Sequence, residues 1–257
     1  MLLAIDIGNT SITLGLFKSD KIDAHWRLSS NSERTSDEYG ILLVQLLERA
    51  GASSGEIKDI AIASVVPPLT GTLERACLDY LGALPLIVDA GTRTGIKIRY
   101  EDPKHQVGAD RVVNAAAVRR FHKGPACIVD FGTATIFDAL SAEGDYLGGA
   151  IAPGIGIASE ALFLRTAKLP RVEIMRPPSP IGRNTVHSLQ SGLLYGYVGL
   201  VDGMVNRFRA ELGPEMKTIG TGALVELIAK ETRSIDIVEP WLALQGLKIV
   251  YDLNRTR

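Results

Sequence analysis

The spacing of apolar residues divides the first thirty positions into three strands. Leu2–Ile7 is a continuous apolar run, which is typical of a buried strand. From Ile12 to Leu16 apolar residues alternate with Thr13 and Gly15, and Ile22–Leu28 follows a polar turn. Alternation with a period of two indicates strands, so the pattern predicts a three-stranded meander.

Beyond the meander, segments with helical spacing alternate with short apolar runs, the pattern expected of an α/β protein. The expected helices are Ser36–Ala50, Leu69–Leu81, Asp110–Phe121, Gly156–Leu164, Thr185–Phe208, one from Ala223, and Pro240–Leu253. The remaining expected strands are Ile57–Val66, Leu84–Asp89, Ala126–Asp130, Thr135–Leu140, Tyr146–Ile151 and Lys217–Ile219. The proline-rich residues 170–180 are expected to form a loop.

The order strand, strand, strand, helix, strand, helix occurs twice along the chain. The clearest similarity between the two copies is Ile5-Asp6-Ile7-Gly8-Asn9-Thr10 against Val129-Asp130-Phe131-Gly132-Thr133-Ala134. In each copy a buried strand ends in Asp-x-Gly and a short hydroxyl or amide residue follows. A duplicated α/β unit is therefore predicted, with domains at 1–118 and 119–257. A cleft between two such halves is the expected ligand site.

Composition excludes several classes of protein. Of the 257 residues 46% are hydrophobic and 22% charged, as in ordinary globular proteins. The net charge of -1 gives no general attraction for nucleic acid or a membrane surface. Cys77 and Cys127 lie far apart without metal-ligand spacing, so no zinc site is expected. With no export signal and no apolar span, a cytoplasmic protein is predicted.

The first acidic-glycine turn has features of a phosphate-binding loop. Gly8 lets the backbone approach a phosphate closely, and Asn9, Thr10 and Ser11 carry donor groups. Asp6 is placed to hold a hydrated Mg²⁺ that bridges the phosphates. Such a short motif also fits a simple tight turn, and the second copy at Asp130 is what favours the phosphate interpretation.

Two further stretches are candidates for the site. Gly154 and Gly156 precede an expected helix whose N-terminus could face an anion, although a packing turn fits equally well. Asp110 opens another helix, where aspartate is commonly a cap. A kinase needs a carboxylate near the acceptor hydroxyl, and Arg111 could bind a carboxylate or phosphate.

Four glycines form a stripe on the long helix after Thr185. Gly192, Gly196, Gly199 and Gly203 fall within about 60° of one another at 100° per residue. Each costs roughly 1 kcal/mol of helix stability relative to alanine. Close packing of another backbone would offset this cost, either inside the subunit or across a dimer.

The motifs together resemble the type III pantothenate kinases, members of the acetate/sugar kinase, chaperone ATPase and actin superfamily. The resemblance covers essentially the whole chain. It rests on the turns at Asp6 and Asp130 and on three further motifs: Ser64-Val65-Val66-Pro67, Gly108-Ala109-Asp110-Arg111 and Gly148-Gly149-Ala150-Ile151-Ala152-Pro153-Gly154. It implies two duplicated ribonuclease H-like (actin-like ATPase) domains with a nucleotide cleft between them. It also implies ATP-dependent phosphorylation of pantothenate to 4′-phosphopantothenate, the first step of coenzyme A biosynthesis.

The resemblance also implies roles for individual residues. Asp110 would be the catalytic base, and the pantothenate-binding residues would be Tyr100, Gly108, Ala109, Asp110, Arg111 and Thr185. The ATP-binding residues would be Asp6, Ile7, Gly8, Asn9, Thr10, Ser11, Ile12, Thr13 and Thr133. Asp130 would help bind a monovalent cation, K⁺ or NH₄⁺, required besides the Mg²⁺ near Asp6. The resemblance further implies a homodimer.

Two departures from the family pattern and two competing functions remain. Gln106 stands where glutamate is common, and Ala223 follows Gly220-Thr221-Gly222 where a second glycine is usual. Neither removes a residue assigned to chemistry. The alternatives are a non-catalytic, nucleotide-binding regulatory relative on the same fold, and a kinase of the superfamily that acts on a sugar or acetate.

Overall fold

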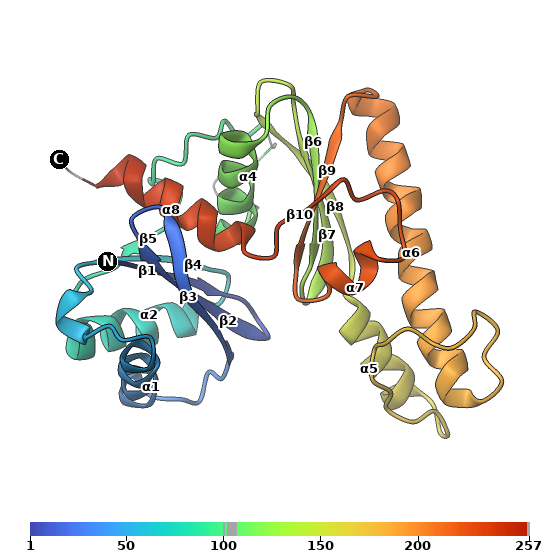
Figure 1. The fold of residues 1–257 in the computed structure, drawn as a ribbon, viewed down its shortest axis with the longest axis horizontal. Helices are drawn as coiled ribbons and strands as arrows, with labels where there is room; N and C mark the ends of the chain where they lie inside the picture. The colour runs from blue at the N-terminus through green and yellow to red at the C-terminus, as the bar shows by residue number, and fades with distance from the viewer. Residues whose placement is uncertain (100, 102–106, 256–257) are drawn as a thin grey trace. The chain divides into compact units, whose positions relative to one another are not determined.

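The computed structural model describes residues 1–99, 101 and 107–255, which form two compact units. Met1–Ile96, Glu101–Arg120 and Leu242–Arg257 make up the first unit, and Lys97–Tyr100 and Phe121–Trp241 the second. Figure 1 shows the elements of both units in the order of the chain.

The first unit contains the predicted meander. Strands β1 (Leu2–Ile7), β2 (Ser11–Lys18) and β3 (Lys21–Ser29) pair antiparallel in sequence. Strand β4 (Asp59–Ser64) joins the other edge of β1 in parallel, and β5 (Leu86–Ile87) pairs with β4. The resulting order is β3-β2-β1-β4-β5.

Two helices cover one face of this sheet (Figure 1). Helix α1 (Ser36–Arg49) begins at Thr35, whose side chain forms a capping box with Glu38. Helix α2 (Pro67–Ala76) continues as one π-helical segment over Cys77–Leu81. Their apolar residues, among them the fully buried Tyr39, pack on the inner positions of β1 and β2 to form the first core.

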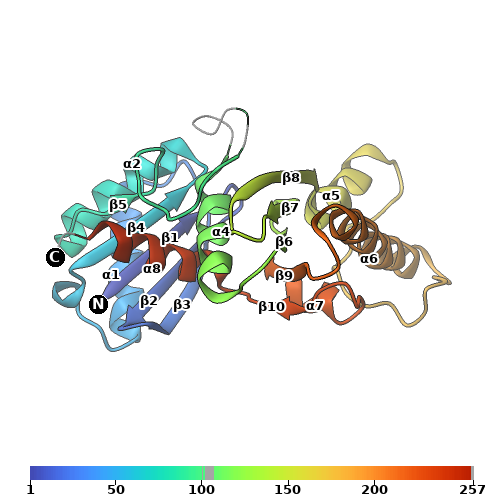
Figure 2. The same cartoon turned by 90° about the horizontal axis from the view of Figure 1, so that it is seen from above.

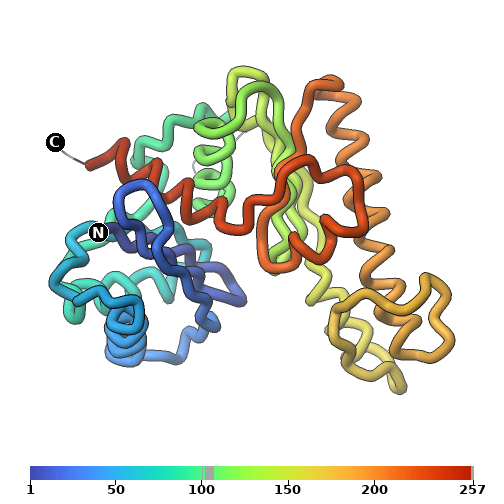
Figure 3. Tube along the Cα trace, in the orientation of Figure 1, coloured from blue at the N-terminus to red at the C-terminus, as the bar shows by residue number. Residues whose placement is uncertain are grey.

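The C-terminal helix α8 (Leu242–Asn254) packs on β1 and β4, as Figure 2 shows. It also packs closely against α4 (Ala109–Phe121). The helices approach each other at Gly246, where a Cβ would overlap the carbonyl oxygen of Val113. Figure 3 traces how the end of the chain returns to its first strands. The first unit is therefore not the continuous segment 1–118 expected from the sequence: residues 242–257, assigned there to the second domain, complete it.

The second unit repeats the order and the strand directions of the first sheet. Strands β6 (Ala126–Phe131), β7 (Ala134–Leu140) and β8 (Tyr146–Pro153) form an antiparallel meander. Strand β9 (Lys217–Gly222) runs parallel to β6, and β10 (Ile237–Val238) parallel to β9. The order β8-β7-β6-β9-β10 matches β3-β2-β1-β4-β5 strand for strand, which confirms the predicted duplicated α/β fold.

Helices α5 (Ile155–Arg165), α6 (Thr185–Leu212) and α7 (Val225–Ala229) complete the second unit. Leu193, Val201 and Val205 of α6 pack with the inner residues of β6 and β7 in the second core. None of the described helices is long and apolar enough to cross a membrane.

The glycine stripe of α6 faces away from this core. Gly192, Gly196 and Gly199 are exposed, and a Cβ at each would meet no atom of the described chain within 4 Å. Packing inside the subunit, one of the two expected explanations, is therefore wrong for these three positions.

Candidate active site

The turn between β1 and β2 is held by hydrogen bonds at both backbone groups of Gly8. The backbone N–H of Gly8 donates to the Ser11 carbonyl at 3.0 Å, and the Ser30 hydroxyl donates to the Gly8 carbonyl at 2.5 Å. Asn9 and Thr10 at the tip are exposed. The side chains of Ile7 and Ile12 are fully buried in the core, so these two predicted ATP-binding residues can offer only backbone groups.

Asp6 and Asp130 occupy the same position in the two sheets. Each is the last residue but one of the central strand, and each pairs across its hairpin, Asp6 with Thr13 and Asp130 with Ile136. Carboxylates at the carboxyl ends of parallel strands stand where open α/β sheets place their ligands. The strand register thus gives both acidic residues equivalent places beside a turn.

The second turn, at Gly132 and Thr133, is held by a neighbouring glycine. The N–H of Gly132 donates to the Ala134 carbonyl, and the N–H of Gly154 donates to the Thr133 carbonyl, both at 3.1 Å. A Cβ on Gly154 would overlap that carbonyl oxygen. Gly154 therefore supports the backbone of this turn by close packing.

A third glycine lies against Asp130. Gly222 has a φ of 93°, and a Cβ there would stand 2.6 Å from the Asp130 Oδ1. Only glycine combines that backbone conformation with the room that the carboxylate occupies. Neither this packing nor that of Gly154 can be recognised from the sequence, because glycine motifs do not show what approaches them.

Asp110 lies in the first turn of α4, and Arg111 follows it. The Arg111 N–H donates to Asp110 Oδ1 at 2.8 Å, and the Arg111 side chain is buried, with 6% exposed. Burial raises the pKa of Asp110 above its ordinary value, and the hydrogen bond from Arg111 and its positive charge offset only part of the effect. A carboxylate with a raised pKa is a stronger base than an exposed one.

The remaining predicted substrate-binding residues have different surroundings. Ala109 is the first residue of α4 and Gly108 directly precedes it. Thr185 is the exposed first residue of α6, after the N-cap Asn184, whose side chain accepts from the His187 N–H at 2.8 Å. Tyr100 lies outside the described residues, as does Gln106.

The donor set fits a magnesium ion held mainly by water and phosphate. The part of the chain that the structure describes contains no group of three His, Cys, Asp or Glu side chains able to enclose a metal. Mg²⁺ in nucleotide sites is usually bound by one or two carboxylates together with substrate phosphates and water. Asp6, a single carboxylate beside the first turn, is suited to that arrangement.

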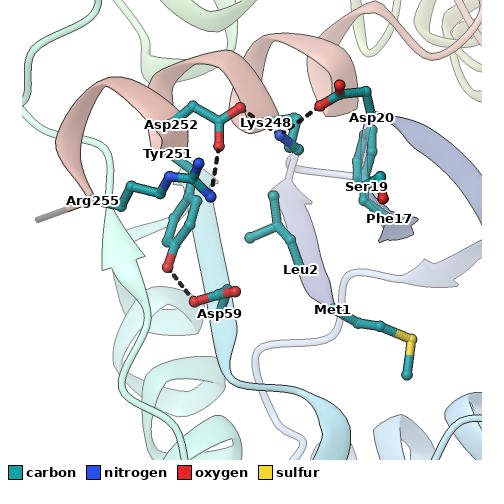
Figure 4. A pocket seen from close by; sticks show the side chains of 10 residues that line it. All are labelled: Met1, Leu2, Phe17, Ser19, Asp20, Asp59, Lys248, Tyr251, Asp252 and Arg255. Carbon is teal, nitrogen blue, oxygen red and sulfur yellow. Dashed lines mark hydrogen bonds and ion pairs between the residues drawn. The ribbon is translucent and has the colours of Figure 1, made fainter. Parts of the chain in front are cut away.

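A separate pocket of about 340 Å³ lies in the first unit (Figure 4). It is lined by Met1 and Leu2 and thus sits at the opposite end of β1 from Asp6. Lys248 bridges Asp20 and Asp252 there, and the Tyr251 hydroxyl donates to Asp59 at 2.5 Å. Its polar groups satisfy one another, so the pocket is not the candidate active site.

Solved structures with a similar fold cover nearly the whole chain. A Campylobacter jejuni protein assigned to the Baf family of transcriptional activators superposes with a TM-score of 0.60 at 18% identity, over 98% of each chain. A Sinorhizobium meliloti protein assigned as a 2-dehydro-3-deoxygalactonokinase gives 0.56 at 12% identity, over 98% of this chain and 97% of that one. At such identities the likeness concerns the fold alone.

Sequence comparisons are more specific. The family model described as type III pantothenate kinase matches residues 2–207. A protein of that name from Moorella thermoacetica is 52% identical over 99% of this chain and 100% of its own length. Another from Geobacter sulfurreducens is 51% identical over the same shares. A family model and relatives that match across both sheets leave one conclusion: this chain belongs to the type III pantothenate kinase family.

Proposed function

We propose that this protein transfers the γ-phosphoryl group of ATP to the primary hydroxyl of pantothenate, giving 4′-phosphopantothenate in the first step of coenzyme A biosynthesis. The observation that carries the proposal is the half-buried carboxylate of Asp110 within Gly108-Ala109-Asp110-Arg111, in a chain about half identical to named pantothenate kinases over its whole length.

Asp110 acts as the base in this proposal. Its carboxylate accepts the proton of the acceptor hydroxyl while the oxygen of that hydroxyl forms a bond to the γ-phosphorus of ATP. The bond from the γ-phosphorus to the bridging oxygen breaks, and ADP leaves. Phosphoryl transfer demands positioning and charge stabilisation more than covalent catalysis, so one oriented carboxylate is sufficient.

Arg111 supports recognition of the acceptor. Its guanidinium can bind a carboxylate through two parallel hydrogen bonds, and pantothenate carries one carboxylate. We assign Gly108, Ala109 and Thr185, together with Tyr100, to the rest of the acceptor site. The exposure of Thr185 at the start of α6 is compatible with direct contact to substrate.

The two turns bind the nucleotide. We assign ATP contacts to residues 6–13 and to Thr133, with Mg²⁺ near Asp6 and K⁺ or NH₄⁺ near Asp130. Mg²⁺ would neutralise phosphate charge that Asp6 and Asp130 would otherwise repel.

A homodimer is part of the same proposal, and α6 supports it. Its exposed glycines leave space for the backbone of a second copy. Exposed apolar side chains also occur on α6 and on α5, which contacts it, among them Ile157 and Leu164 of α5 and Val186 of α6. Burial of such side chains against a second copy would add to the stability of a dimer.

A coupled assay for ADP release tests the function directly. We expect turnover with pantothenate, stimulated by K⁺ or NH₄⁺ over Na⁺, and none with a panel of sugars or acetate. Turnover with a sugar or acetate instead would assign the protein to a neighbouring kinase class. ATP binding without any product would favour a regulatory protein and contradict the proposal.

A further inference from the structure

We propose that Val65, in the turn between β4 and α2, is a positioning residue that holds the loop carrying Asp110 in its reactive place. The inference rests on the proposed function, since it assigns Asp110 to the acceptor hydroxyl. Val65 belongs to Ser64-Val65-Val66-Pro67, a motif to which no role has been given so far.

Val65 and Asp110 meet at the same glycine. A Cβ placed on Gly108 would lie 3.1 Å from Val65 Cγ1 and would overlap Asp110 Oδ1. The missing side chain therefore leaves a space that a methyl group of Val65 and the carboxylate of Asp110 both approach. Any movement of the Val65 side chain therefore changes the packing of Gly108 at the start of α4.

The Val65 backbone is itself firmly held. Its N–H donates to the carbonyl of Ile7 at 3.1 Å, so the turn continues the pairing of β4 with β1. On the other side, the Ser64 hydroxyl accepts from the Val66 N–H at 3.1 Å and from the Thr70 hydroxyl at 2.7 Å. Val65 thus links β1, the strand that carries Asp6, to Gly108 at the start of α4.

Val65 also bears on the solvation of the base. The pKa of Asp110 is raised because the carboxylate is buried, and Arg111 is the charged side chain that opposes this effect among the described residues. Because Val65 approaches Gly108 from the same side as the Asp110 carboxylate, we attribute part of the burial of that carboxylate to its methyl groups. Removing its methyl groups should admit water and lower the pKa toward the ordinary value.

The neighbouring valine provides a matched control. Val66 is half-buried like Val65 and lies in the same turn, but it packs against the first hydrophobic core rather than against Gly108. Val65→Ala and Val66→Ala therefore delete the same two methyl groups from adjacent positions. If Val65 served only to stabilise the fold, the two variants should lose activity to a similar extent.

The experiment compares both variants with the wild-type protein in two measurements. Steady-state kinetics with ATP and pantothenate should show kcat lower by on the order of 10- to 100-fold in Val65→Ala, with the KM for ATP unchanged, because misplacing a catalytic group costs rates of this size. The pKa of Asp110, followed by carboxyl ¹³C NMR of the free protein, should be lower in Val65→Ala than in Val66→Ala.

Equal kcat values in the two variants, together with equal Asp110 pKa values, would overturn the role of Val65. The NMR measurement needs no turnover, so it tests Val65 even if pantothenate is not the acceptor. Failure of the proposed function would appear separately, as a wild-type protein that leaves pantothenate unmodified.

Discussion

Asp110 shows how one residue can favour activity at a cost in stability. Its burial raises the pKa, so the folded protein binds the Asp110 proton more tightly than the unfolded chain does. Between the ordinary pKa and the raised one, the folded state therefore carries more protons, and the free energy of unfolding falls as pH rises through this window. Above the raised pKa the ionised base is a destabilising group.

The variant Asp110→Asn separates the two properties. We expect kcat to fall by on the order of 10²- to 10⁴-fold, the usual contribution of a general base. Thermal unfolding at pH 7 should occur at the same or a higher temperature, since a buried charge is removed. For the wild type, kcat/KM should decrease as pH falls through the raised pKa, because protonated Asp110 cannot accept the hydroxyl proton.

Asp79→Asn is the control for this substitution. Asp79 is also in the first unit, but it pairs at the surface with Arg75 at 2.5 Å. Its substitution should leave both kcat and the acid limb of the pH profile unchanged. A stable and fully active Asp110→Asn protein would contradict the assignment of the base.

Gly154 permits a test of the second turn by the addition of a single methyl group. In Gly154→Ala the new Cβ would overlap the Thr133 carbonyl oxygen and displace the second turn. We expect kcat/KM for ATP to fall at least about tenfold, a loss of roughly 1.4 kcal/mol in transition-state stabilisation. Gly156→Ala, two residues on, meets no atom within 4 Å and should leave ATP kinetics unaltered.

Among the elements, α6 has two faces with different surroundings. Leu193, Val201 and Val205 belong to the second core, whereas the glycine stripe faces outward. Exposed glycine inside a helix lowers its stability by about 1 kcal/mol per residue relative to alanine. The stripe is therefore costly in an isolated subunit, which is the physical reason to place a second copy against it.

Gly196→Leu should convert a dimer into a monomer, because the isobutyl group would fill the space that the partner helix needs. Light scattering coupled to size-exclusion chromatography measures the change. Gly71→Leu is the comparison, since Gly71 is a helical glycine of α2 with no atom near its Cβ position. A Gly196→Leu protein with unchanged mass would show that the stripe is not the dimer contact.

Most elements follow from the sequence, and the exceptions have identifiable causes. The helix expected over Leu69–Leu81 changes to π-helical hydrogen bonding at Cys77, which leaves the spacing of apolar residues almost unaltered. Strand β10 covers only Ile237–Val238, too short for any periodicity. The strand expected at Leu84–Asp89 contracts to Leu86–Ile87. At its start Pro85 has no N–H to donate, and at its end the Val88 N–H still donates to the Ile62 carbonyl.

The candidate site likewise contains residues that the sequence identifies and contacts that it does not. Asp6, Gly8 and Asp110 stand in motifs with a chemical rationale, so the sequence points to them. The packing of Val65 against Gly108 joins residues distant along the chain, and no local pattern encodes such a contact. The roles of Asp130 and Thr185 remain predictions that depend on the family resemblance.

For the molecule as a whole, the decisive feature is the return of the C-terminal helix to the first sheet. The apolar face of α8 can be recognised from the sequence, but its periodicity does not reveal which sheet it covers. Leu242, Leu244, Leu247 and Val250 are fully buried there. The expected boundary at 118 and 119 therefore divides a unit that is discontinuous in sequence.

Leu247→Ala should destabilise the first unit by about 2–5 kcal/mol, the usual effect of deleting a buried leucine side chain. Leu253→Ala on the same helix should change stability by less than about 1 kcal/mol, since Leu253 is 43% exposed. Urea unfolding followed by tryptophan fluorescence in a Trp241→Phe background, where Trp26 is the remaining tryptophan, reports on the first unit. Equal effects of the two substitutions would show that α8 does not stabilise that unit.

The discontinuous first unit also has a consequence for biosynthesis. A ribosome delivers β1 to β5 early, yet the helix that covers them emerges only after the entire second unit has been translated. Until then, one face of the first sheet lacks its cover and remains open to wrong associations in the nascent chain. We therefore expect the middle of the polypeptide to reach its native state first and the beginning of the polypeptide to mature only after translation ends.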